Sequence, residues 1–164
     1  MWDSVAPAIE KEWDQNRRVT TPLYSRKHWA ILSDTRISEE VVSQQIVKTS
    51  HWPGDEVQQL WAQGKRIQCI YGGPSDWTLL AEQTSHSPAP QVVQAGPEPD
   101  NFDFNFHLSS GYKLIGATFQ PISKIYAFLW EVAPSDIVHN QQIHFTADFP
   151  HLQLAELGLQ LETR

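Results

Sequence analysis

The side chains that could carry out chemistry are seven histidines, one cysteine and a few acidic pairs. Zinc sites use spacings such as His-x-x-x-His on a helix or Cys-x-x-Cys, and neither spacing occurs here. We therefore predict no metal ligand and no cofactor. The histidines concerned are His28, His51, His86, His107, His139, His144 and His151.

The remaining reactive groups also lack the context of an active site. Cys69 lies in the apolar segment 67–71 without a local nucleophile motif, so we expect a small core residue. The glycine pair at 72–73 precedes a proline and opens no helix, which indicates a turn and not a phosphate-binding loop. The acidic pairs at 39–40 and 55–56 fit a loop and a helix start. The sequence therefore predicts no catalytic residue; an enzyme with an unrecognised site is the least favoured interpretation.

The composition indicates a soluble single domain. The chain has 164 residues, 40% of them apolar, and a formal net charge of −7, which disfavours nucleic acid as a partner. Its basic pairs, 17–18 and 65–66, are interpreted as solvated strand edges. No stretch approaches the roughly 18 apolar residues of a membrane span, and the first residues lack a signal-peptide pattern. We expect a cytoplasmic protein that does not bind membranes.

An internal repeat indicates which helices and strands would position a functional site. Three phrases recur in the same order three times, and copies one and two align without a gap. Repeats of roughly 20–50 residues are typical of solenoids, propellers and related architectures. The first phrase spans 13–19, 61–67 and 108–114; the second spans 29–33, 77–81 and 126–130; the third spans 45–49, 91–95 and 142–146.

Each copy is predicted to be a short helix followed by three strands. In copy two, Val57, Leu60 and Trp61 share one helix face, and Gly64 is suited to the left-handed residue that ends the helix. Asn16 can take the same role in copy one. Two alternating segments, 66–71 and 77–82, flank a turn-rich connector and predict a hairpin. The third strand follows a loop.

The predicted fold class is mainly β with short helices (α+β), built from three repeated helix–β–β–β units. The units span about 1–50, 51–99 and 100–150, and a C-terminal helix covers 151–164. The helix of copy three is the weakest, because the aromatics between 102 and 106 alternate with period two and also fit a strand.

The tryptophan phrase, Trp-x-x-Gly-x-x-Ile followed by a turn and Trp-apolar-apolar, resembles a known repeat. It is similar to the tryptophan-rich repeat domain at the C-terminus of plant casein-kinase-I-like kinases, found also in bacterial multidomain proteins. The resemblance covers about residues 9–149; Leu108 and Tyr126 depart from it where tryptophan is expected. It implies a propeller-like accessory or interaction module and transfers no catalytic residue.

Three units are fewer than the 4–8 blades of a closed propeller. Two arrangements therefore stay open: two chains that complete a six-bladed ring, or a pseudo-threefold closure within one chain.

The sequence favours a non-catalytic protein-interaction or assembly module, an accessory subunit that binds a protein partner or forms a homo-oligomer. The alternative is a carbohydrate- or small-ligand-binding repeat domain. Because the repeated tryptophans are expected in the core, the candidate interface consists of aromatic and leucine side chains that do not repeat. These are Trp2, Phe102, Phe104, Phe106, Leu154, Leu157 and Leu161.

Overall fold

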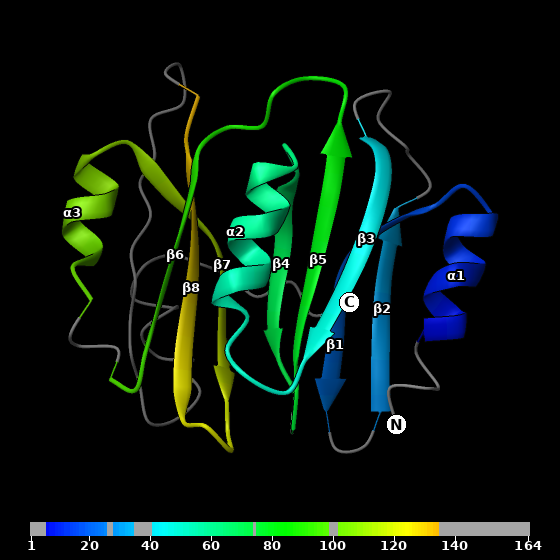
Figure 1. Ribbon diagram of the computed structural model, residues 1–164, viewed down its shortest axis with the longest axis horizontal. Coiled ribbons are helices and arrows are strands. Elements are labelled where there is room, and N and C mark those ends of the chain that lie inside the picture. Colours follow the sequence, from blue (N-terminus) through cyan, green and yellow to red (C-terminus); the bar gives the residue numbers. More distant parts are fainter. Residues whose placement is uncertain (1–5, 26–27, 35–40, 74, 99–101, 135–164) are drawn as a thin grey trace, which may run out of the picture.

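Three helices and eight strands make up the part of the chain that the computed structural model describes, residues 6–25, 28–34, 41–73, 75–98 and 102–134 (Figure 1). None of the described helices is long and apolar enough to cross a membrane. The elements are α1 (Ala6–Asp14), β1 (Arg18–Ser25), β2 (His28–Asp34), β3 (Val41–Thr49), α2 (Gly54–Ala62), β4 (Arg66–Gly72), β5 (Trp77–Thr84), β6 (Gln91–Gly96), α3 (Phe104–Ser109), β7 (Tyr112–Gln120) and β8 (Ile125–Val132).

The fold is mainly β with short helices, as the sequence predicts, and its three small sheets are antiparallel. Their strand orders are β1-β2, β3-β5-β4 and β6-β8-β7. The third strands of copies one and two, β3 and β6, therefore pair with the hairpin of the next copy. We name the structural units by their sheets: unit A (α1, β1, β2), unit B (β3, α2, β4, β5) and unit C (β6, α3, β7, β8). Figure 1 shows them side by side, with unit B between A and C.

The turn after each helix takes the conformation that the repeat predicts. Asn16, Gly64 and Gly111 occupy equivalent positions and have φ values of 59°, 71° and 82°. In copy three the first turn is helical, because the Asp103 side chain accepts a hydrogen bond from the Phe106 backbone N–H at 2.9 Å. The helix of copy three thus forms, and the strand alternative for the alternating aromatics is wrong.

Sheet register corrects the alignment of the third phrase. Gln44 lies opposite Glu82 in the β3–β5 pair, and Gln91 lies opposite Glu131 in the β6–β8 pair. The residue equivalent to Gln91 is therefore Gln44 and not Gln45. A second shared feature is the register shift in each hairpin, at Val19/Thr21, Ile67/Cys69 and Leu114/Gly116. Such bulges bend a strand and increase its twist, so the three hairpins are bent in the same way.

The apolar core lies at the joints between units. One cluster joins Ile9 and Val19 of unit A to Leu80 of unit B. A larger cluster joins the α2 and β4 side chains of unit B to Ala127 and Leu129 of unit C. Each unit therefore completes its core with a neighbour, as expected of a repeat protein. The repeated Trp77, and the non-repeated Trp130, are fully buried; Trp13 and Trp61 pack half-buried against these clusters.

We predict that Gly64→Ala lowers the free energy of unfolding by about 1 kcal/mol, because a Cβ is unfavourable at positive φ. Nothing lies within 4 Å of the added Cβ, so the backbone strain is the whole effect. Gly64→Asn, which copies Asn16, is the matched control and should cost less. Urea unfolding of the three proteins measures this; equal losses for Ala and Asn would contradict it.

We also predict that Cys69 makes stability fall at high pH. Burial raises the pKa of its thiol from 9.0 to about 11, so the folded protein keeps the proton that the unfolded chain releases. Stability linked to the thiol is complete below pH 9.0 and is lost as pH rises towards about 11. Wild type should therefore lose stability relative to Cys69→Ala across this window, as measured by denaturant unfolding at each pH. A difference that does not change with pH would refute the assignment.

Candidate functional site

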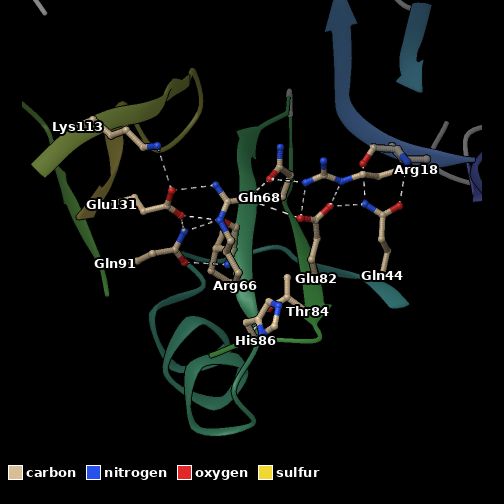
Figure 2. A network of polar contacts seen from close by, with 12 residues as sticks. Arg18, Gln44, Arg66, Gln68, Glu82, Thr84, His86, Gln91, Lys113 and Glu131 are labelled. Carbon is tan, nitrogen blue, oxygen red and sulfur yellow. Dashed lines mark hydrogen bonds and ion pairs between the residues drawn. The ribbon is translucent and has the colours of Figure 1, made fainter. Parts of the chain in front are cut away.

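The A–B joint contains a buried carboxylate with donors from two units. Glu82 on β5 has a side chain only 1% exposed. The guanidinium of Arg18 on β1 donates to both of its oxygens, with Nε–Oε1 and Nη2–Oε2 distances of 2.7 and 2.6 Å. The amide of Gln44 on β3 donates to Oε1 at 2.8 Å. Figure 2 shows this network at the meeting of the strands. The pair is bidentate, the geometry in which an arginine–carboxylate contact is strongest.

The B–C joint repeats this arrangement. Arg66 on β4 donates to Glu131 on β8, with Nε–Oε2 and Nη2–Oε1 distances of 2.5 and 3.1 Å. Gln91 on β6 donates to Glu131 Oε2 at 3.1 Å. Both networks appear in Figure 2 on either side of β4. The two joints are thus held by the same three residue types at equivalent repeat positions.

The glutamine in each joint also binds the edge of the preceding sheet. Gln44 accepts from Val19 N–H at 2.8 Å and donates to Val19 C=O at 2.7 Å. It further accepts from the indole N–H of Trp13 at 2.9 Å. Gln91 makes the same three contacts, with Ile67 N–H (2.8 Å), Ile67 C=O (2.8 Å) and Trp61 (3.2 Å). The indole N–H groups of the repeated first-phrase tryptophans therefore hold the joint together.

Arg66 and Lys113 each have a longer contact with the glutamate of their own unit. Arg66 Nη1 lies 3.6 Å from Glu82 Oε2, and Lys113 Nζ lies 3.5 Å from Glu131 Oε1. Lys113 stands at the position of Arg18 and Arg66 in the repeat. It thus keeps the contact with the glutamate of its own unit.

Two further acidic side chains tie elements together. The Ser33 hydroxyl donates to Glu12 Oε2 at 2.5 Å and, with Arg17 beside it, lowers the pKa of Glu12. Lys48 on β3 lies 2.9 Å from Asp76, just before β5, and lowers the pKa of Asp76. Both carboxylates are thereby held ionised in structural contacts.

An open groove follows each joint. One, of about 260 Å³, is lined by Trp13 and Gln44 with the start of β3. The other, of about 290 Å³, is lined by Trp61 and Gln91 with α2. The amides of both glutamines are already engaged. The second groove is lined mainly by tryptophan and aliphatic side chains, whereas the first also has Asn16, Arg17 and Ser43 in its lining.

The candidate interface residues that the structure describes differ in burial. Phe102 and Phe104 are half-buried and pack edge-to-face on Phe128, with ring centroids 5.3 and 4.9 Å away. Phe106 is 59% exposed. The other four candidates, Trp2, Leu154, Leu157 and Leu161, lie outside the described residues.

Among the histidines, His107 takes a core position. It is 8% exposed and stacks on Trp130 with ring centroids 5.0 Å apart, where copy two has the buried Leu60. His51 instead pairs at the surface with Glu56, at 3.5 Å. Within the described ranges, no group of three or more histidine, cysteine or acidic side chains is placed to hold a metal ion.

The sequence analysis did not predict that Arg18 and Arg66 are part of the joints. The prediction of solvated strand edges is wrong for Arg18 and Arg66, whose side chains are only 23% and 21% exposed. A recurring signal was present: a basic residue is the first or second residue of the first strand of each copy, and an acidic residue lies within the last three residues of the second. The acidic positions are Asp34, Glu82 and Glu131.

Comparison with known proteins finds no matching family model, no matching curated protein and no matching solved structure. The described residues form a mainly β fold with short helices and three small sheets joined by polar networks. The resemblance to the tryptophan-rich repeat domain stays a prediction.

We predict that Glu82→Ala lowers the free energy of unfolding by about 3–5 kcal/mol, because it removes the buried carboxylate that pairs bidentately with Arg18 and the longer contact of Arg66. Glu82→Gln keeps the shape and one acceptor oxygen and should cost less. Glu10→Ala, at an exposed carboxylate on α1, is the control and should change stability by under about 0.5 kcal/mol. Urea unfolding decides; a loss at Glu82 no larger than at Glu10 would show that the joint contributes nothing.

Proposed function

We propose that this chain is a non-catalytic protein-interaction and assembly module, an accessory part of a larger complex. The observation that carries the proposal is the use of its polar residues. The two clusters of arginine, glutamate and glutamine side chains at the joints connect one unit to the next. A catalytic site would instead need such groups to converge on space that a substrate can enter.

The proposed arrangement is a propeller-like array. The first strands of the three hairpins, β1, β4 and β7, lie in sequence, with β4 in contact with both β1 and β7. Bulges at equivalent positions bend the hairpins alike, which supports a regular rotation from one unit to the next. Arrays of this kind present extended surfaces and ends to protein partners.

Carbohydrate or small-ligand binding is the less supported alternative. The two equivalent grooves favour it, because a sugar can stack on a tryptophan ring. However, the glutamine amide in each groove already makes four hydrogen bonds, two accepted and two donated. In the second groove this leaves Gln58 as the other polar side chain in the lining, whereas the first groove also has Asn16, Arg17 and Ser43.

The proposal predicts that the protein in extracts of its own cells elutes well above its monomer mass of 18.7 kDa. Size-exclusion chromatography of the tagged chain at its native abundance measures this, and purified protein run alone separates self-assembly from a foreign partner. A single monomer peak in both runs would rule out an assembly function.

A further inference from the structure

The two grooves that follow the joints occupy equivalent places but differ in their polar lining. The groove beside Gln91 is lined mainly by α2 and β6, and none of the described residues in its lining is charged. The groove beside Gln44, which we call the A–B groove, is lined by the turn after α1 and the start of β3, and it includes Arg17. Lys65 aligns with Arg17 in the repeat but is not part of the other lining. Chemistry specific to the A–B groove therefore depends on side chains that the repeat does not share.

Arg17 keeps open the edge of the guanidinium that the two joint arginines use. Arg18 and Arg66 each hold a glutamate through Nε and Nη2. Arg17 instead contacts Glu12 through Nη1 alone, at 3.3 Å, and its side chain is 41% exposed. Within the described residues, Nε and Nη2 of Arg17 have no hydrogen-bond partner. These two N–H groups match the two oxygens of a carboxylate.

An apolar surface lies in the same groove. It consists of the Trp13 ring with Val41 and Val42, and Val42 is 67% exposed. Asn16 and Ser43 add an amide and a hydroxyl to the lining. The volume of about 260 Å³ is below the roughly 300–1,000 Å³ of sites that enclose a small molecule. The groove is therefore better suited to one anchoring side chain of a larger partner than to a whole ligand.

The charge of the lining favours an anionic partner. Arg17 and Arg18 both line the A–B groove, and none of the described residues in this lining is acidic. Their carboxylate partners, Glu12 and Glu82, lie outside the lining, and Glu82 is buried. Because Arg18 is engaged with Glu82 in the bidentate contact, Arg17 is the arginine that can donate to a ligand. A carboxylate is attracted to this position, whereas a cation is repelled.

We propose that the A–B groove binds an acidic peptide segment of the partner protein. A glutamate or aspartate of that segment accepts hydrogen bonds from Nε and Nη2 of Arg17, and a neighbouring aromatic or aliphatic side chain packs against Trp13 and Val42. This inference rests on the proposed assembly function and names the chemistry of the partner's anchor. Arginine and tryptophan are enriched among the residues that carry most of the binding energy of protein interfaces.

Titration of the purified 164-residue chain with a synthetic peptide tests the carboxylate contact. The probe is acetyl-Gly-Phe-Glu-Gly-amide, and the same peptide with glutamine in place of glutamate is its neutral counterpart. Tryptophan fluorescence measures affinity, and the nitrogen NMR signal of Arg17 Nε reports contact with the guanidinium. The glutamate peptide should bind on the order of tenfold more tightly than the glutamine peptide, a ratio that about 1.4 kcal/mol supplies.

Substitutions separate the charged contact from the apolar one. Arg17→Gln should lower affinity for the glutamate peptide to that for the glutamine peptide. Arg17→Lys should restore only part of the loss, because an ammonium lacks the planar fork. Val42→Ser should weaken binding of both peptides alike. Lys65→Gln, at the equivalent repeat position, is the matched control and should bind both peptides as wild type does. Circular dichroism of each variant checks that it is folded.

Three results would overturn the proposal: an unchanged Arg17 Nε signal in wild type at saturating peptide, equal affinities for the glutamate and glutamine peptides, or an equal loss of affinity in Lys65→Gln. Binding of a phosphoserine peptide where the glutamate peptide does not bind would overturn the choice of a carboxylate. A chain that binds neither peptide but still elutes as a larger complex from cell extract would end the groove model and leave the assembly function standing. Peptide binding by a chain that elutes only as a monomer would support the groove and count against assembly.

Discussion

The bidentate contact between an arginine of one unit and a buried glutamate of the next is the interaction on which the architecture depends. Burying a carboxylate costs several kcal/mol unless it is paired and hydrogen-bonded. Glu82 meets this condition with donors from Arg18 and Gln44, which belong to units A and B. The carboxylate is satisfied only when the two units meet in one orientation. Apolar packing alone would tolerate several, so the ion pair acts mainly by specifying how units stack.

The glutamine at each joint satisfies backbone groups at a sheet edge. β1 and β4 are edge strands of their sheets, so the outward peptide groups of Val19 and Ile67 have no strand partner. An exposed row of such groups is a template for unwanted pairing. One amide side chain supplies both an acceptor and a donor and covers that peptide. Because the same glutamine also binds the glutamate, the edge is closed only where the ion pair forms.

Local patterns in the sequence predicted the elements well, because each depends on neighbouring residues. The helix ends at Asn16 and Gly64, the hairpins and the burial of Trp77 follow from turn chemistry and periodicity. The pairing of the third strand does not follow from such local patterns, because its own sequence does not indicate which hairpin it joins. The one-residue alignment error arose from the consecutive Gln44 and Gln45. Only a cross-strand partner, Glu82, distinguishes them.

The burial of Arg18 and Arg66 could not be predicted from the sequence, for a related reason. A basic residue at the start of a strand is usually solvated, and its burial here depends on an acid about 64 residues away in sequence. The repeat shows that these basic and acidic positions are equivalent from copy to copy, but it does not show that they are in contact. The signal becomes specific only when basic, acidic and glutamine positions are compared together across copies. Their recurrence marks a shared joint and not three separate surfaces.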